Sequence, residues 1–460
     1  MDPFVPLSPD WWVARLYQRL QVQRAEFEFY DAYYRGVHPL PWLAPQARNE
    51  FRRVLQMCRA NYMGLVCDAT AERLQPEGFR VGDSESADVD SWRIWQANGL
   101  DTYIDQAILE SLIGGQSFVL VAPNADDPST PRMWAEHPTQ AVVEYVPGMG
   151  RRERAAGLKV WDDDWTGHVH ATLYLPAGLF KFQARRSQSG LMPTVPVWER
   201  REVDGEEWGV GNPLGMVPLV ELANNPRLLT GGVSELSDVV DVQDRVNKTL
   251  ADRLITQDFG AFPQKWAVAW PDEDNEGNPT PPIDVGRNRM VTTSVAETKF
   301  GQWDAAPLDP YSAAKREDVK DIASRTRTPA QYLLGEMSNV NGETLKASES
   351  GLVSKCRQRM RTFGEGLEDA VRLARQAAGL PVDASMETVW RNPEFRTEGE
   401  VTDAAVKKLQ SGIASLRQAR VDVGYSETLI RQLEQDDADA ATDPTLERIA
   451  RDLTGGQGAA

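Results

Sequence analysis

One apolar stripe in the second half of the chain constrains the fold more than any other feature. From Glu343 onward, apolar residues recur at steps of seven, four and three, which places them on one face of an α-helix. The stripe consists of Leu345, Leu352, Cys356, Met360, Phe363, Leu367, Val371, Ala374 and Ala378. About 36 residues at about 1.5 Å each predict a rod roughly 54 Å long. Asn341 is the expected N-cap and Gly379 the expected stop of this helix. Gly364 and Gly366 predict a kink at their position within it.

The segment in front of this helix has no regular period. Thr328-Pro329 ends the preceding pattern, and small or polar residues dominate the chain from there to the helix. The sequence therefore predicts a flexible loop at the tip of a long helix. The loop residues are Gly335, Glu336, Met337, Ser338, Asn339, Val340 and Asn341.

Composition limits the classes of function. A chain of 460 residues predicts more than one domain, and a net charge of −18 argues against gripping nucleic acid by bulk attraction. It does not exclude a protein through which nucleic acid passes. The three cysteines, Cys58, Cys67 and Cys356, lie in helical apolar patterns and are expected to be reduced core residues. No apolar run approaches 18 residues and the N-terminus lacks a basic region, so we expect neither a membrane span nor a signal peptide, and synthesis in the cytoplasm.

The order of patterns predicts an α+β fold that is mainly helical. Helical patterns cover residues 8–30, 46–74, 89–97, 100–113, 234–259 and 312–326, with Ser234 and Ser312 as expected caps. A buried strand is expected at 117–122, followed by a small antiparallel β unit with strands at 141–146, 156–161, 169–175, 179–182 and 195–203. After the long helix come an extended piece at 389–393, helices at 402–411, 415–423 and 426–434, and an acidic tail.

The helices at 234–259 and 312–326 enclose a loop-rich, proline-rich segment. Two strands are expected in it, at 266–270 and 289–295, separated by an acidic stretch that suits an exposed tip. We therefore expect an α–β–α protrusion in which two helices leave and return.

A cluster of acidic residues and histidines suggests metal chemistry. Asp162, Asp163 and Asp164 shortly precede His168 and His170, and carboxylates beside such a pair can bind a divalent metal. A solvated hairpin turn explains the same residues, because Asp is favoured in turns, and we favour the turn. A metal-dependent nuclease or hydrolase remains an alternative. Metal titration by calorimetry, with Asp163→Ala as control, distinguishes a metal site from a plain turn.

Basic residues on two helices are the candidates for contact with nucleic acid. They are Lys315, Arg316, Lys320, Arg325, Arg327 and Lys346, and an exposed helix laced with ion pairs explains the first five equally well. Lys355, Arg357, Arg359 and Arg361 are expected on a solvent or intersubunit face. The chain has no GxxxxGK[ST], GxSxG, HExxH or paired CxxC motif, so an ATP-driven motor or ordinary hydrolase is poorly supported and no cofactor is expected.

The order of these pieces resembles the portal proteins of tailed double-stranded DNA bacteriophages, of the siphophage type. The resemblance rests on the run from Thr328 to Gly335, on Ser338-Asn339-Val340-Asn341-Gly342-Glu343 before a long helix, and on the α–β–α protrusion. Tyr33-Tyr34-Arg35-Gly36 and Gly114-Gly115-Gln116-Ser117 are further matching pieces. The resemblance covers most of the chain, and no single motif is diagnostic.

The resemblance implies a division of the chain into named parts. Residues 1–233 would form a wing (helical in 1–115, β-rich in 116–233), 234–260 and 311–328 two stem helices, and 261–310 a clip between them. Residues 329–342 would hold the tunnel loop, 343–400 the long wing helix and the strand after it, and 401–460 a crown and acidic tail. The clip residues expected to dock partners are Trp270, Asp272, Glu273, Asp274, Glu276, Arg287 and Arg289.

The resemblance also implies partners and place. A homo-oligomeric ring, usually of twelve subunits, would sit at one capsid vertex of the virion after assembly in the host bacterial cytoplasm. Double-stranded DNA would pass through its channel during packaging and ejection. The terminase large subunit ATPase and a head-completion or tail adaptor protein would dock on it, beside major capsid and scaffolding proteins. The role implied is non-enzymatic; a structural capsid or scaffold-binding protein without a channel is a further alternative, which deleting residues 335–341 distinguishes.

Overall fold

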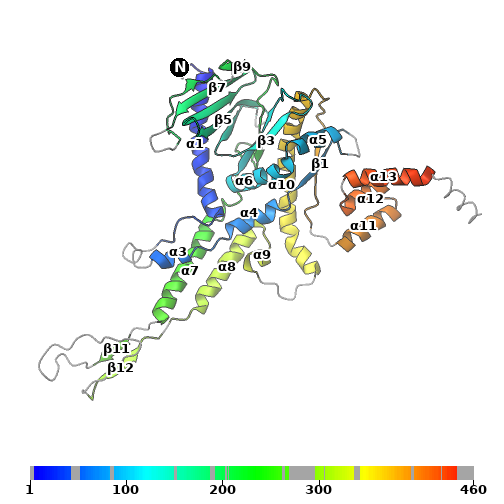
Figure 1. Cartoon of the computed structure of the whole chain (residues 1–460). Helices are drawn as coiled ribbons and strands as arrows, with labels where there is room; N and C mark the ends of the chain where they lie inside the picture. The colour runs from blue at the N-terminus through cyan, green and yellow to red at the C-terminus, as the bar shows by residue number, and fades with distance from the viewer. Residues whose placement is uncertain are drawn as a thin grey trace, which may run out of the picture. The chain divides into compact units, whose positions relative to one another are not determined.

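The computed structural model describes residues 5–42, 52–82, 87–149, 153–186, 192–202, 205, 207–261, 265–268, 296–304, 306–335, 342–394, 398–425 and 427–442. These residues form two compact units (Figure 1). The first comprises residues 1–75 and 94–382, and the second residues 76–93 and 383–460. The expected α+β class is confirmed at the level of helices combined with small antiparallel sheets.

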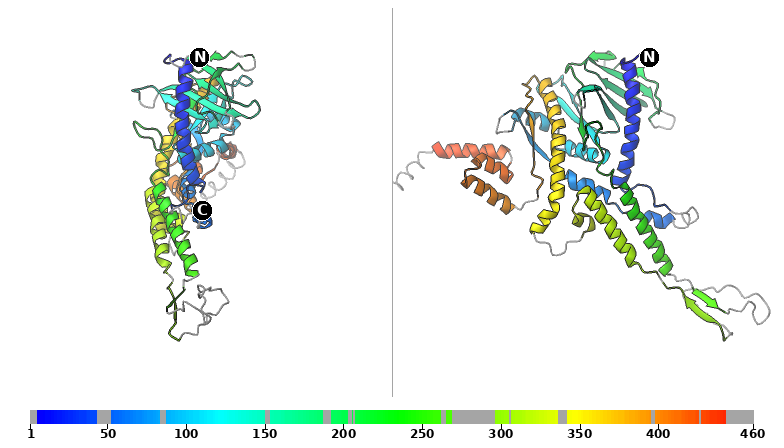
Figure 2. Two further views of the ribbon diagram at one scale, coloured as in Figure 1. Left: turned by 90° about the vertical axis from the view of Figure 1, so that its left-hand side faces the viewer. Right: turned by 180° about the vertical axis from the view of Figure 1, so that it is seen from behind.

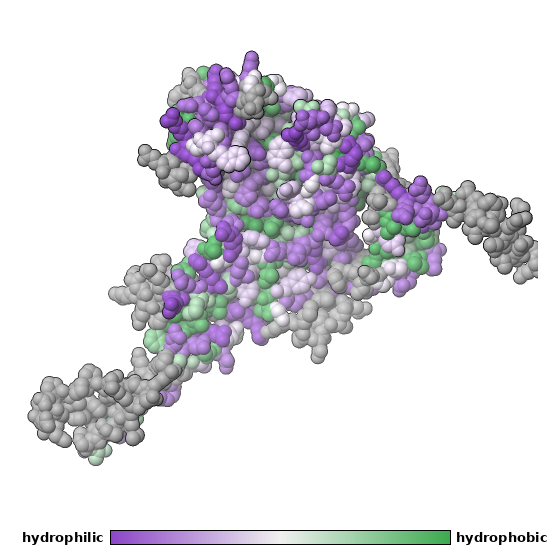
Figure 3. Space-filling view, in the orientation of Figure 1, coloured by the Kyte–Doolittle hydropathy of each residue, from purple (hydrophilic) through white to green (hydrophobic). Residues whose placement is uncertain are grey.

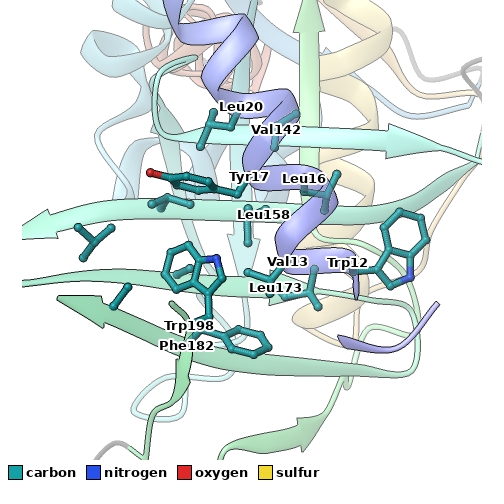
Figure 4. Packing of buried hydrophobic residues seen from close by; sticks show 14 of the residues in the cluster. Trp12, Val13, Leu16, Tyr17, Leu20, Val142, Leu158, Leu173, Phe182 and Trp198 are labelled. Carbon is teal, nitrogen blue, oxygen red and sulfur yellow. The ribbon is translucent and has the colours of Figure 1, made fainter. Parts of the chain in front are cut away.

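A six-stranded antiparallel sheet and helix α1 (Pro9–Tyr34) form the largest core of the first unit. The sheet has the order β4-β5-β6-β7-β8, with β9 beside β7. Its strands are β4 (Ala141–Tyr145), β5 (Arg154–Asp163), β6 (His168–Tyr174), β7 (Gly178–Arg185), β8 (Glu199–Arg200) and β9 (Gly209–Gly211). Trp12, Leu16 and Leu20 share one face of α1 and pack against Leu158 and Leu173 of the sheet (Figure 4).

A second sheet lies between the first sheet and two further helices. Its strands are β10 (Leu219–Ala223), β2 (Gln116–Ala122) and β3 (Arg132–Glu136), in that order. Phe118 and Leu120 join a core with Val143 of the six-stranded sheet, while α6 (Leu100–Gly114) and α10 (Gly342–Ala377) pack on β2 and β10. Because both faces are covered, β2 is a nearly continuous apolar run rather than an alternating one.

Helix α10 is the predicted long helix, and its length of 36 residues is confirmed. Leu352, Cys356 and Phe363 of the stripe are fully buried, and Gly379 beyond the helix has a positive φ of 70°. A Cβ at Gly366 would lie 2.9 Å from the carbonyl oxygen of Glu221 in β10. Gly366 therefore permits α10 to approach the sheet closely, and the helix is continuous at this residue. The kink expected at Gly364 and Gly366 stays a prediction. The N-cap residue Asn341 lies outside the described residues.

Helices α7 (Val240–Ala261) and α8 (Asp309–Thr326) lie side by side and lead to a two-stranded antiparallel ribbon (Figure 2). The ribbon pairs β11 (Lys265–Val268) with β12 (Lys299–Gln302). The α–β–α protrusion is thus confirmed as an arrangement of elements. Strand β12 follows the stretch 289–295 in which a strand was expected, and that stretch lies outside the described residues.

Both helices of the pair begin elsewhere than predicted. Helix α7 starts at Val240 rather than at Ser234, because residues 234–239 form tight turns in which Ser237 N–H donates to the Ser234 carbonyl and Val239 N–H to the Leu236 carbonyl. Helix α8 starts at Asp309, so Ser312 lies inside it.

The predicted helix over 46–74 is wrong as one element. The described part consists of α3 (Arg52–Met57), α4 (Met63–Ala71) and an irregular stretch between them. Side chains of α7 replace the missing helical hydrogen bonds there: Ala60 N–H donates to Asn247 Oδ1 and Tyr62 N–H to Gln243 Oε1.

The second unit contains a two-stranded antiparallel sheet and three packed helices. Strand β1 (Pro76–Arg80) pairs with β13 (Glu387–Trp390). Helix α12 (Leu416–Val423) contacts α11 (Glu398–Gln410) and α13 (Glu427–Thr442). Ser415 caps α12, and Gly424 ends it with a φ of 94°. Helix α5 (Val89–Ala97) spans a boundary between the two units.

Candidate functional site

The ends of the predicted loop are held to the first turns of α10. Helix α9 (Ala330–Leu334) precedes the loop, and Gly335 ends it in the left-handed conformation with open space around its Cα. Tyr332 of α9 donates its hydroxyl hydrogen to Glu349 Oε1 of α10 at 2.6 Å and accepts from Arg73 Nη2 at 2.9 Å. Arg73 also lies 3.3 Å from Glu349, with only 15% and 9% of the two side chains exposed. The two flanks of the loop are therefore joined by a three-residue cluster whose two charged side chains are largely buried. The predicted residues Glu336, Met337, Ser338, Asn339, Val340 and Asn341 lie outside the described residues.

A buried carboxylate fixes the next part of α10. The side chain of Glu235, which precedes α7, is 6% exposed and accepts from Arg359 Nε at 2.7 Å and from Asn224 Nδ2 at 3.2 Å. Lys355 Nζ lies 3.5 Å from its second oxygen. Burial alone would raise the pKa of Glu235, but the charges of Lys355 and Arg359 outweigh it and hold the pKa below its usual range.

Lys355 also caps the C-terminus of α8. Its ammonium group donates to the carbonyl oxygen of Thr326 at 2.9 Å, where α8 ends and Arg327 turns into the left-handed conformation. A cation at this position satisfies a terminal carbonyl and complements the helix dipole. Glu235, Lys355 and Arg359, which we call the α10 triad, therefore tie α10 to both paired helices.

The prediction for Lys355 and Arg359 is wrong. They were expected on a solvent or intersubunit face together with Arg357 and Arg361, but only the latter two are exposed. Lys355 and Arg359 stand four residues apart, where like charges repel unless an anion lies between them. That spacing beside the apolar stripe was the available signal. Their anion, Glu235, is far away in sequence and could not be located from a local pattern.

The predicted basic residues of α8 mostly have partners within the subunit. Lys320 pairs with Glu317 at 2.7 Å, Lys315 Nζ lies 5.8 Å from the centre of the Tyr62 ring, and Arg325 donates to the Asp238 carbonyl at 3.2 Å. Arg316, Arg327 and Lys346 are exposed. Arg245 of α7 bridges Asp318 and Asp321 of α8, each at 2.7 Å. The ion-paired alternative therefore describes this helix pair better than a free basic stripe, and charged and apolar residues are interspersed over it (Figure 3).

A buried polar cluster holds the start of α7 against the end of α1. Tyr33 donates to Asp244 at 3.0 Å and stacks on His38, whose ring is fully buried with a centroid separation of 4.8 Å. Asn247 Nδ2 lies 2.6 Å from His38 Nε2, which fits a neutral ring that accepts this hydrogen. Burial, with the nearby Arg59 charge, lowers the pKa of His38 to about 4.

This cluster predicts a loss of stability in mild acid. The unfolded chain binds a proton at His38 with a pKa of 6.5, while the folded chain resists it until about 4. The contribution of His38 to the free energy of unfolding is therefore fully present above pH 6.5. It is lost as the pH drops toward 4, which lowers the free energy of unfolding by at most about 3 kcal/mol. Denaturant unfolding between pH 7 and pH 4.5 checks this, with His38→Gln as the comparison. A variant with the same pH slope as the wild type would contradict it.

The acidic cluster at Asp162–His170 is a hairpin turn, as favoured. The turn joins β5 to β6, and Asp163 accepts from Thr166 Oγ1 at 2.8 Å and lies 3.2 Å from His170 Nε2. Hydrogen bonds from Thr166 and the backbone lower the pKa of Asp163 to about 2. Asp162 and Asp164 are turned to Arg186 instead. Across the described residues no group of three or more His, Cys, Asp or Glu side chains is placed to hold a metal ion.

Three further predictions concern the cysteines, membrane-spanning helices and the clip residues. Cys58, Cys67 and Cys356 are free and buried, as predicted. No helix in the described ranges is both long and apolar enough to cross a membrane. The clip residues Trp270, Asp272, Glu273, Asp274, Glu276, Arg287 and Arg289 lie outside the described residues.

Comparison with known proteins identifies the family. The family model described as "Phage portal protein, SPP1 Gp6-like" matches residues 14–440. The portal proteins of Mycobacterium phage D29 and Mycobacterium phage L5 are each 31% identical over 390 residues, which cover 80% of this chain and 77% and 76% of theirs. Among solved structures, a chain titled as the neck of an empty GTA particle matches with 12% identity and a TM-score of 0.45, covering 84% of this chain and 95% of that one. The chain belongs to the phage portal proteins of the SPP1 Gp6-like family.

Proposed function

We propose that copies of this chain assemble into a closed ring, with twelve as the expected number, at one vertex of the capsid. The ring is a non-enzymatic channel through which double-stranded DNA enters during packaging and leaves during ejection. The observation that carries this proposal is family membership over most of the chain, combined with the 36-residue helix α10 that follows the predicted loop. The loop of residues 335–341 faces the channel, and its flanks are fixed to α10 by Tyr332 and Arg73.

The parts of the subunit are proposed to divide this work. Helices α7 and α8 are the stem, and the segment 261–310 with the β11–β12 ribbon is the clip. The clip docks the terminase large subunit ATPase and later the head-completion or tail adaptor protein. Residues 1–233 and α10 form the wing, and α11 to α13 belong to the crown. Capsid and scaffolding proteins surround the ring, which is built in the host cytoplasm and ends in the virion.

The charge distribution supports passage rather than gripping. Duplex DNA carries one negative charge per about 1.7 Å of axis, so a strong cationic contact repeated around a ring would hold it in place. The chain has a net charge of −18, and Lys315, Lys320 and Arg325 already have partners within the subunit. The channel-facing loop offers small polar residues, among them Ser338 and Asn339, whose contacts are weak and replaceable.

The test is direct imaging of the purified protein. Negative-stain micrographs and native mass measurement are expected to show closed rings with rotational symmetry and a central opening. A chain that stays monomeric under all assembly conditions, with no ring in micrographs, would refute the channel. Rings without an opening would favour the channel-less structural alternative.

A further inference from the structure

The helices α11, α12 and α13 leave their larger apolar side chains uncovered. Among the described residues of 398–442, the buried apolar side chains are those of Ala405, Ala419 and Ile430. Larger apolar side chains are between 38% and 78% exposed, and they belong to Val406, Leu409, Ile413, Leu416, Val421, Tyr425 and Leu429. Apolar side chains accordingly reach the surface in this part of the molecule (Figure 3). Three short helices with so small a core need a further apolar partner.

Four of these side chains lie where α11 turns into α12. We call them the junction face, which consists of Val406, Leu409, Ile413 and Leu416. Ile413 N–H donates to the Lys408 carbonyl at 2.9 Å, and Gly412 has a φ of 71°, which is a common way to end a helix. Lys408 Nζ also pairs with Asp422 Oδ2 of α12 at 2.6 Å. The junction face is therefore held in place by hydrogen bonds within the unit.

The sequence after α13 has the pattern of one more amphipathic helix. This stretch lies outside the described residues, so its helix is a prediction from the sequence. Asp443-Pro444 suits the N-cap and first position of a helix, and Gly455 suits its end. The apolar residues between them have the spacing i, i+3, i+4 and i+7, and they are Leu446, Ile449, Ala450 and Leu453. A helix of about 11 residues is marginal in water by itself, so it also needs an apolar partner.

This segment begins close enough to the junction face to cover it. Arg417, which directly follows Leu416, donates from Nη1 to Glu434 of α13 at 2.8 Å. Helix α13 continues from Glu434 to Thr442, a rise of about 12 Å. The residue before a proline disfavours the α conformation, so Asp443-Pro444 ends α13 and allows the chain to turn back. A helix of about 11 residues is roughly 16 Å long and therefore spans the distance back to Leu416.

We propose that residues 444–454 form a helix whose apolar side packs on the junction face of the same chain. A short tether raises the effective concentration of the segment at this face, which favours the chain's own segment over a second copy. Burial of Ile413 and Leu416, which are 78% and 46% exposed without it, stabilises the contact. The inference concerns the single chain and does not rest on the proposed ring.

Hydrogen exchange of the full-length chain, followed by mass spectrometry, tests this contact. The amides of residues 446–454 are expected to exchange at least about tenfold more slowly than those of a free peptide of the same sequence. The pair Ile413→Asp and Leu416→Asp is expected to remove this protection, because two carboxylates would face the apolar side of the helix. The matched control is Val195→Asp with Val197→Asp, which alters apolar side chains of the first unit that are 85% and 81% exposed and should leave the protection unchanged.

Two results of this experiment would overturn the proposal. Residues 446–454 that exchange as fast as the free peptide would show that no helix docks. Protection that survives Ile413→Asp with Leu416→Asp would place the helix on another surface. Amides of α11 and α12 should stay protected in that variant, which separates lost docking from lost folding.

Cross-linking identifies the chain that supplies the segment and does not depend on the aspartate variants. The three native cysteines are buried, so Ile413→Cys with Ile449→Cys provides two thiols for a short bismaleimide. The expected link joins two peptides of one chain and leaves the mass near 51.3 kDa on a denaturing gel. Links at multiples of that mass would assign the junction face to a second copy, and absence of any link would also contradict the proposal. The expected link in a chain that never forms rings would refute the proposed function alone.

Discussion

Replacing Glu235 with glutamine is expected to lower the free energy of unfolding by about 3–5 kcal/mol. The substitution keeps the volume of the side chain but removes the negative charge that lies between Lys355 and Arg359, which are 4% and 5% exposed. Two buried like charges would then face each other without an anion. Denaturant unfolding of the unassembled chain, followed by tryptophan fluorescence, measures the loss.

Two comparisons test whether buried charge is the cause. Glu144→Gln removes the partner of Arg15, whose side chain is 51% exposed, and is expected to cost no more than about 1 kcal/mol. Combining Glu235→Leu with Lys355→Met and Arg359→Leu removes all three charges and should restore most of the lost stability. A triple variant as unstable as Glu235→Gln would instead assign the loss to packing.

Replacing residues 335–341 with a glycine–serine linker of equal length is expected to abolish DNA packaging while rings still assemble. The cluster of Tyr332, Arg73 and Glu349 lies outside the replaced segment, so both flanks remain attached. The side chains proposed to meet DNA are lost from every subunit at once. DNA protected from nuclease per head should fall by at least about tenfold, since the deficit is repeated around the ring.

A single added charge provides the opposite perturbation. Asn339→Arg introduces one cation per subunit, and repeated phosphate contacts strengthen binding steeply and make it depend on salt. Packaging is expected to slow, and added salt should restore part of the rate. Packaging at the wild-type rate by both the linker variant and Asn339→Arg would show that the loop does not contact DNA.

The sequence predicted those elements whose patterns are local. The stripe from Leu352 to Ala374 repeats on one face of a helix, so the length of α10 followed from spacing alone. Gly379 acts within a few residues of the end of α10 and was predicted as its stop for the same reason. The pairing of α7 with α8 also followed, because two helical patterns enclose a loop-rich, proline-rich segment.

The missed features depend on contacts between distant residues. The break between α3 and α4 exists because Gln243 and Asn247 bind the backbone of Ala60 and Tyr62. The sequence around residues 58–62 does not indicate that Gln243 and Asn247 will bind there. In the candidate site, the loop over residues 335–341 stays a prediction from composition. The α10 triad was missed, because a helical pattern cannot show which anion lies opposite two cations.

The three points at which α10 is fastened set its register along the molecule. Glu349 meets Arg73 and Tyr332, Lys355 meets the end of α8, and Arg359 meets Glu235 and Asn225. Translation of the helix along its own axis by one turn, about 5.4 Å, would separate all of these pairs at the same moment. We therefore expect any change in the shape of the subunit to bend the segments that connect to α10 and to leave the helix in its present register.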